Sequence, residues 1–370
     1  MSARFLTVVL ERAFNMRDGF GREIDYMRIS VIDSCNLNCY YCNPCDNNEH
    51  CHALNILSVK EVLCIVRAAT RLGIKHFRLT GGEPLLHPQL DEMVLQIKKI
   101  PGVSSVSLTT NAVLLAQHAK WLKEAGIDSI NVSLDTIDAS EYERITKKPL
   151  LEEVKHGINA AIECGIRVKI NVVLTPQTDV VALTRYVAKK GTDIRFIEMM
   201  PVGEGHTNGV EPYKKVIGTL SKLYGEPCRI NTEKTKEINS GNDKRKIPDN
   251  GPAEYYIFPE LGIRVGLIQA IHGKFCDTCN RIRVTADGRL MPCLGSSVTM
   301  DLVPDSWDFA DDVEKDFAIV RALGAAIKAK PRCHNFNDNV VTYTKTTETK
   351  TTEIEAAEVN AARNMSRIGG

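Results

Sequence analysis

Strand-like apolar runs alternate with helical patterns over the first two-thirds of the chain, and this alternation constrains the fold more than any other feature. The strand-like runs cover residues 27–32, 76–80, 103–109, 129–134, 168–174 and 194–199. The helical patterns cover residues 58–72, 88–99, 114–125, 151–164 and 180–189. Such an order predicts a parallel sheet with right-handed crossovers. Six strands are too few to close an eight-stranded barrel, so we predict an α/β fold containing an incomplete (β/α)6 TIM-like barrel.

Residues typical of helix ends support these helices. Ser58 and Glu61 have the spacing of a capping box, in which each side chain accepts a hydrogen bond from the other residue's backbone. Gly73, Gly126 and Gly165 stand where helix C-caps are expected.

Polar residues and glycines gather where the predicted strands end. Singly, each is typical of a turn or a helix cap. Active sites of such barrels lie at the carboxyl ends of the strands, so six strand ends with unusual residues predict a pocket there. The residues are Cys35, Gly81, Gly82, Glu83, Pro84, Thr109, Thr110, Asn111, Ser133, Asp135, Asn171 and Glu198.

A first cysteine trio, Cys35, Cys39 and Cys42, follows the first predicted strand with C-x3-C-x2-C spacing. A cubane iron–sulfur cluster normally takes four thiolates, so three would leave one iron open to a small molecule. A structural zinc site is the alternative, because a nearby Cys or His pair could complete a tetrahedron. Cys45 and Cys51, with the histidines at 50 and 52, could supply that pair.

A second trio, Cys276, Cys279 and Cys293, has C-x2-C-x13-C spacing and again lacks a fourth cysteine close by. Two sets of three thiols in one chain favour two clusters, each with one open iron, over an incomplete zinc knot.

Composition is consistent with an enzyme that binds metal clusters. The chain has 370 residues, twelve cysteines and a formal net charge of +1. The charge argues against a general nucleic-acid binder. We find no secretory signal and no apolar stretch of membrane-spanning length, so we expect a cytoplasmic protein whose cysteines bind metal rather than form disulfides.

Several motifs resemble known families. CNLNCYYC, RLTGGEPLL, LTTN and NVSLD resemble the radical S-adenosylmethionine (SAM) superfamily. More closely, IRFIEMMPVGEG, FCDTCNRIRVTADGRLMPCL and the terminal MSRIGG resemble the family of GTP 3',8-cyclases. The similarity runs from residue 18 to residue 370, and the second trio with its following arginines points to the cyclases in particular.

This resemblance implies a reaction and two cofactor types. The first trio would hold a [4Fe–4S] cluster that binds SAM and cleaves it to a 5'-deoxyadenosyl radical. The second trio would hold an auxiliary [4Fe–4S] cluster that binds the purine edge of GTP. The implied reaction converts GTP to 3',8-cyclo-7,8-dihydro-GTP, the first step of molybdenum cofactor (molybdopterin) biosynthesis, and makes the chain a lyase.

The resemblance also implies roles for individual residues. The residues expected to bind SAM are Gly81, Gly82, Glu83, Thr110, Asn111 and Ser133. The chain has no G-x-x-x-x-G-K-[ST] loop, so basic side chains must bind the triphosphate, and arginine does so with paired hydrogen bonds. The residues expected to bind GTP are Arg28, Arg78, Lys169, Arg195, Arg281 and Arg283. The terminal Gly369 and Gly370 are expected to enter the active site and take part in catalysis.

The implied organisation has four parts. They are an N-terminal segment (1–25), the partial barrel (26–202), a smaller C-terminal cluster- and substrate-binding extension (203–335) and a tail (336–370). The implied partners are an electron donor such as flavodoxin or ferredoxin, a downstream cyclic pyranopterin monophosphate synthase and a second copy in a homodimer, with no nucleic acid and no membrane.

The chain departs from the usual family pattern at Ser34, His76, His87 and Ala112. Two other functions therefore stay open at this point. One is a different radical SAM enzyme with an auxiliary cluster, such as a peptide-modifying enzyme, and the other is a non-catalytic zinc-binding module.

Overall fold

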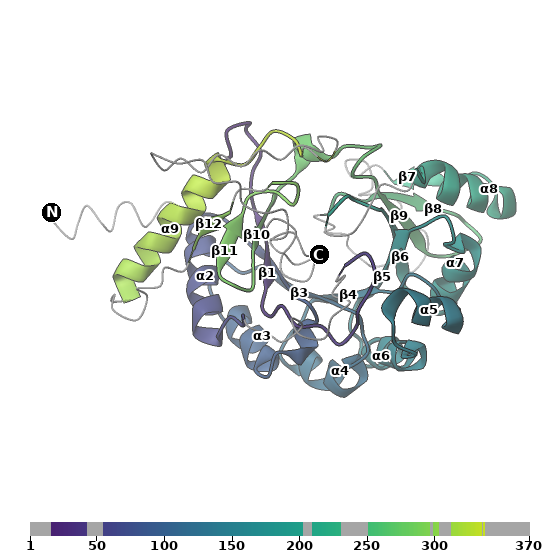
Figure 1. Ribbon diagram of the computed structural model, residues 1–370, viewed down its shortest axis with the longest axis horizontal. Helices are drawn as coiled ribbons and strands as arrows, with labels where there is room; N and C mark the ends of the chain where they lie inside the picture. Colours follow the sequence, from purple (N-terminus) through teal and green to yellow (C-terminus); the bar gives the residue numbers. More distant parts are fainter. Residues whose placement is uncertain are drawn as a thin grey trace, which may run out of the picture.

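The computed structural model describes residues 16–42, 55–202, 209–230, 251–296, 299–302, 312–334 and 336. Within these residues, the strands form one twelve-stranded sheet in the order β12-β11-β10-β1-β2-β3-β4-β5-β6-β9-β8-β7. The sheet curves into an open barrel whose outer face is covered by helices (Figure 1). No helix of the described part is long and apolar enough to cross a membrane.

The centre of the sheet consists of the predicted strands and helices, each found within two residues of its expected ends. The parallel strands are β1 (Tyr26–Ser30), β2 (His76–Thr80), β3 (Ser105–Thr110), β4 (Ser129–Ser133), β5 (Val168–Leu174) and β6 (Asp193–Glu198). The helices between them are α2 (Val59–Arg71), α3 (Leu90–Lys98), α4 (Leu115–Glu124), α6 (Leu151–Glu163) and α7 (Val180–Lys189). The incomplete barrel is thus confirmed.

The C-terminal extension continues this sheet at both edges. One edge adds β9 (Arg264–Ile268), parallel to β6, followed by β8 (Glu254–Ile257) and β7 (Cys228–Ile230). The other adds β10 (Arg281–Val284), parallel to β1, followed by β11 (Arg289–Met291) and β12 (Met300–Asp301). A buried ion pair between Asp193 and Arg264 joins the first residues of β6 and β9.

Three more helices and three short turns complete the elements of the described chain. They are the helices α5 (Ala139–Thr146), α8 (Gly218–Tyr224) and α9 (Asp312–Lys328), the π-helical turn η2 (Tyr213–Ile217) and the 3-10 turns η1 (Pro84–Leu86) and η3 (Cys276–Thr278). Helix α9 packs beside α2 at the edge of the barrel (Figure 1), where Arg71 and Asp316 form an ion pair of 2.9 Å.

Local signals explain the helix ends. Ser58 and Glu61 form the expected capping box at the start of α2. Gly73, Gly126 and Gly165 each take a left-handed backbone, with φ between 69° and 88°, just beyond a helix end. A side chain is disfavoured in this conformation, so glycine ends these helices at low cost.

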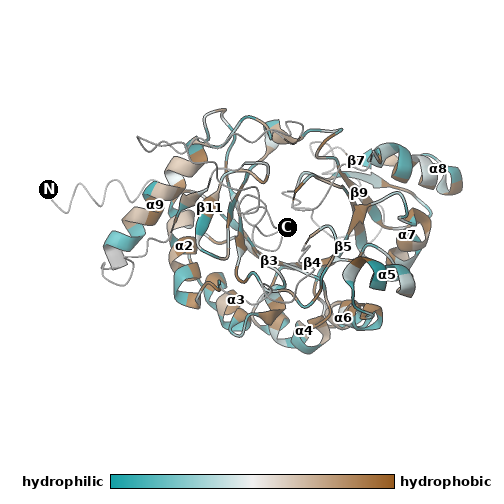
Figure 2. Cartoon of the chain, in the orientation of Figure 1, coloured by the Kyte–Doolittle hydropathy of each residue, from teal (hydrophilic) through white to brown (hydrophobic). Residues whose placement is uncertain are grey.

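The core lies between the sheet and its helices. Phe77 and Leu79 of β2 are fully buried in this core, whereas Arg78 between them lines the barrel's central cavity. Successive side chains of a strand point to opposite faces. One strand therefore places side chains in the core on its outer face and in the cavity on its inner face. The helices are apolar on the side facing the sheet and hydrophilic outside (Figure 2).

The loops after β1 and β2 are in direct backbone contact. The backbone N–H of Gly82 donates to Ile32 O at 2.8 Å, and that of Glu83 donates to Ser34 O at 2.7 Å. A Cβ on Gly82 would lie 2.1 Å from Ser34 O. Glycine is therefore required for the packing of this loop against the residues that lead into Cys35.

Replacing Gly82 with Ala should lower the free energy of unfolding by about 1–3 kcal/mol or more, because the new methyl group meets backbone that cannot rotate away. Gly218→Ala is the matched control, since its Cβ would meet nothing within 4 Å. Urea denaturation of both variants checks the difference, and equal stabilities would contradict the contact.

Candidate functional site

The barrel encloses a cavity of about 750 Å³ that is lined by all six cysteines of the two trios. Its lining includes residues before the strands, such as Ser104 and Arg167, and residues after them, such as Cys35 and Asn111. The cavity therefore runs along the whole length of the strands. The predicted pocket at the carboxyl ends forms part of it.

The loop carrying the first trio is held by the end of α5, an element that sequence reasoning missed. The backbone N–H groups of Asn38 and Tyr40 donate to Thr146 O and Ile145 O at 3.0 and 3.2 Å. Tyr41 donates its hydroxyl to Asp135 Oδ2 at 2.5 Å. These bonds fix the loop on both sides of Cys39.

Burial disfavours thiolates in the first trio. Burial and the nearby Glu83 raise the pKa of Cys35 to about 12, and burial with the neighbouring Cys35 raises that of Cys42 to about 12. Three thiolates can coexist here only beside a cation that offsets their charge, and bound metal supplies such a charge.

The second trio lies on the extension. Cys276 begins η3, Cys279 directly follows it, and Cys293 comes shortly after β11. The cysteines of both trios are free of disulfides. Burial raises the pKa of Cys279, but Lys330 and Arg281 outweigh this effect and leave the pKa lowered. The surroundings of this thiol thus favour its anionic, metal-binding form.

The residues expected to bind SAM fall into two groups. Gly81, Gly82, Thr110, Asn111 and Ser133 line the cavity. Glu83 is fully buried, and its carboxylate accepts hydrogen bonds from Thr110 Oγ1 (2.6 Å), Asn111 N (2.7 Å) and Leu85 N (3.1 Å). In this structure Glu83 therefore orients two residues of the lining. Its role as a direct SAM contact stays a prediction.

The six basic residues expected to bind GTP all line the cavity: Arg28, Arg78, Lys169, Arg195, Arg281 and Arg283. In the sheet register, Arg28 of β1 stands beside Arg78 of β2 and Arg283 of β10. Burial, with repulsion from Arg283 and Arg78, lowers the pKa of Arg28 well below its usual value. Buried like charges are costly, so this wall of the cavity favours an anionic ligand.

Some lining residues were not nominated from the sequence. Lys330 is 2 % exposed, and His334 donates its Nε2–H to Ala270 O, 2.8 Å away. Tyr26 lies below two guanidinium groups, those of Arg78 and Arg281, at 5.8 and 6.0 Å from its ring centre. Lys330 and His334 both belong to the stretch KPRCHNF, residues 330–336, in which Lys330 stands three residues before Cys333 and His334 directly after it.

The four positions that depart from the family pattern are all among the described residues. His87 is buried and its Nε2 contacts Leu57 O at 3.0 Å, while His76 Nδ1 contacts Ser105 Oγ at 2.8 Å. Ala112 takes a left-handed backbone with φ of 65°. The carbonyl of Ser34 receives the bond from Glu83 described above. Gly369, Gly370, Cys45 and Cys51 lie outside the described residues.

Comparison with known proteins identifies two family models along the chain. Residues 29–182 match the radical SAM superfamily, and residues 192–336 match the molybdenum cofactor synthesis C family.

Curated relatives match nearly the whole chain. A GTP 3',8-cyclase of Clostridium perfringens is 35% identical over 324 residues, which is 87% of this chain and 95% of that relative. A GTP 3',8-cyclase of Pelotomaculum thermopropionicum is 36% identical over 86% of this chain and 95% of that relative.

Solved structures show the same fold. Streptococcus suis SuiB bound to its precursor peptide SuiA has a TM-score of 0.55 at 16% identity, over 82% of this chain and 67% of SuiB. SuiB bound to S-adenosylmethionine has a TM-score of 0.51 at 16% identity, over 77% of this chain and 65% of SuiB.

The buried carboxyl group of Glu83 predicts a pH-dependent stability. Burial raises its pKa from 4.5 to about 7 although three hydrogen bonds oppose the change. Between these values the folded protein binds more protons than the unfolded one, so stability falls as the pH rises. We therefore compare the unfolding free energy of the metal-free wild type with that of Glu83→Gln. From pH 4.5 to pH 7 the difference should fall by on the order of 3 kcal/mol. Urea denaturation at several pH values checks this, with the exposed Glu124→Gln as control. A constant difference between wild type and Glu83→Gln would contradict it.

Proposed function

Because the chain belongs to the family of GTP 3',8-cyclases within the radical SAM superfamily, we propose that it converts GTP to 3',8-cyclo-7,8-dihydro-GTP by radical chemistry, the first step of molybdenum cofactor biosynthesis. The observation that carries this proposal is the single cavity onto which both cysteine trios and six basic side chains open.

The cysteines fit two [4Fe–4S] clusters. Each trio offers three thiols that line the cavity and form no disulfide, and no further cysteine of the described residues lines it. Three thiolates leave one iron of a cubane without a protein ligand. When bound, a reduced cluster and SAM supply one-electron bond cleavage, while the protein binds, orients and shields the reactants.

At the first trio, the protein would hold SAM through the ends of β2, β3 and β4. Gly81 and Gly82 bring main chain next to the cysteine loop, and Ser133 adds a hydroxyl. The Asn111 amide donates to Asn36 Oδ1 at 2.7 Å and lies 3.7 Å from Cys35 Sγ. Asn111 is thus fixed by Glu83 through its backbone and by Asn36 through its side chain.

Toward the second trio, the basic side chains would bind the triphosphate of GTP. Arg281 and Arg283 follow Cys279 by two and four residues on β10 and face the same cavity. Arg195 is oriented by a 2.9 Å bond from its Nε to Asn171 Oδ1. Guanidinium groups bind phosphate oxygens through two parallel hydrogen bonds, which would fix the ribose between the trios.

The finer parts of the proposal rest on family membership. They are the lyase class, an electron donor such as flavodoxin or ferredoxin, delivery of product to a cyclic pyranopterin monophosphate synthase, a homodimer, and entry of Gly369 and Gly370 into the site.

Anaerobically reconstituted protein with SAM, reductant and GTP should yield 5'-deoxyadenosine together with the cyclised nucleotide. Cys35→Ala should abolish both products because the SAM-binding cluster is lost. Cys293→Ala should reduce the cyclised nucleotide more than SAM cleavage. The exposed Cys228→Ala is the control. Deoxyadenosine formation that does not depend on GTP would contradict the proposed substrate and favour another radical SAM reaction.

Replacing Arg281 with Ala should weaken GTP binding about 10- to 100-fold, which is the loss expected for one or two charge-assisted hydrogen bonds. Calorimetric titration with GTP measures the dissociation constant. Arg289→Ala is the matched control, because Arg289 is exposed on the neighbouring β11. Equal dissociation constants for GTP in the two variants would show that Arg281 does not contact the nucleotide.

A further inference from the structure

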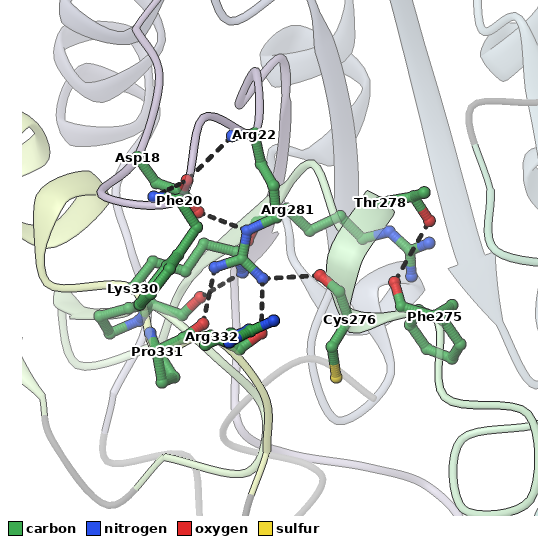
Figure 3. A network of polar contacts seen from close by, with 11 residues as sticks. Asp18, Phe20, Arg22, Phe275, Cys276, Thr278, Arg281, Lys330, Pro331 and Arg332 are labelled. Carbon is green, nitrogen blue, oxygen red and sulfur yellow. Dashed lines mark hydrogen bonds and ion pairs between the residues drawn. The ribbon is translucent and has the colours of Figure 1, made fainter.

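Two buried cations, Arg22 and Lys330, hold the backbone that carries the second cysteine trio (Figure 3). Arg22 is 8 % exposed and Lys330 is 2 % exposed. Arg22 comes from the segment before β1, and Lys330 comes from the segment after α9. Both therefore reach the trio from parts of the sequence that carry none of its cysteines.

Arg22 contacts the backbone of a cysteine directly. Its Nη1 donates to Cys276 O at 2.6 Å and to Arg332 O at 2.9 Å, and its Nη2 donates to Pro331 O at 2.6 Å. Its Nε pairs with Asp18, and Asp18 in turn accepts hydrogen bonds from the backbone of Phe20 and Arg22. The guanidinium group is thus held in one orientation, as Figure 3 shows.

Lys330 contacts the backbone close to the two other cysteines of the trio, Cys279 and Cys293. Its Nζ donates to Arg281 O at 2.7 Å and to Pro292 O at 2.9 Å. Arg281 follows Cys279 by two residues, and Pro292 directly precedes Cys293. One ammonium group therefore ties the chain beside Cys279 to the chain beside Cys293.

Fixing these segments lowers the cost of binding a cluster. The three thiols stand on two stretches of backbone, one with Cys276 and Cys279 and one with Cys293, that no disulfide connects. If the stretches were mobile, their ordering would oppose cluster binding, at a cost of about 1–2 kcal/mol per residue ordered. Hydrogen bonds from a buried cation to carbonyl oxygens are stronger than neutral ones, so they suit this task.

We propose that Arg22 and Lys330 are positioning residues that preorganise the second trio for its cluster, Arg22 at Cys276 and Lys330 at the segments of Cys279 and Cys293. The inference rests on the proposed function in one respect, namely that the second trio holds an iron–sulfur cluster.

The test uses two parent proteins, one with the first trio replaced by alanine and one with the second trio replaced. Each then binds at most one cluster. After anaerobic reconstitution, the rate of iron release to a chelator and the visible and electron paramagnetic resonance spectra report on that cluster alone.

Arg22→Lys keeps the charge but loses the planar set of donors that reaches four acceptors. In the parent that retains the second trio, it should speed iron release about 10-fold or more, the usual effect of losing a contact that orients a metal ligand. Lys330→Gln should act in the same direction. In the parent that retains the first trio, both variants should release iron at the parental rate.

Exposed neighbours provide matched controls. Arg17→Lys lies on the same segment as Arg22, and Lys328→Gln lies at the end of α9, close to Lys330. Both should leave iron release unchanged in both parents.

Three results would overturn the inference. Equal acceleration in both parents would show that Arg22 and Lys330 stabilise the fold as a whole, and unchanged release in both would show that they do not support the trio. If the unmutated parent that retains the second trio binds no cluster, the second cluster of the proposed function fails as well, and this is seen before any variant is made.

Discussion

The parallel pairing of β10 with β1 brings together the two halves of the site. Arg281 and Arg283 stand beside Tyr26 and Arg28 in this register, although more than 250 residues separate them along the chain. This pairing places the chain that follows Cys279 directly against β1, the strand that leads to the first trio. Backbone hydrogen bonds between strands are directional, so a barrel edge is a rigid place to attach a second metal site.

The cavity contains two regions that favour ligands of opposite charge. Around the first trio, burial and acidic neighbours keep the thiols neutral until metal binds. Along β1, β2 and β10, buried guanidinium groups repel one another. Each region therefore favours a ligand of opposite charge.

The sequence predicted the centre of the fold well and its edges poorly. Each of the six strands of the βα units is five to seven residues long and flanked by helices with clear periodicity. Five of the six strands from β7 to β12 have only two to four residues, which is too short for a periodic pattern. Helix α5 was missed because its eight residues are mostly polar. Cys35, Arg283 and the other cavity residues were found by motif, whereas Arg22 acts through contacts with residues more than 250 positions away, which no local pattern reveals.

The cavity extends from the residues that precede the strands to the loops that follow them. Strands of five to seven residues span roughly 17–23 Å at about 3.3 Å per residue. An elongated molecule lying along this axis can contact chemically distinct groups at its two ends, while a compact one reaches a single end. A cavity of this length therefore suits an elongated anion better than a compact one.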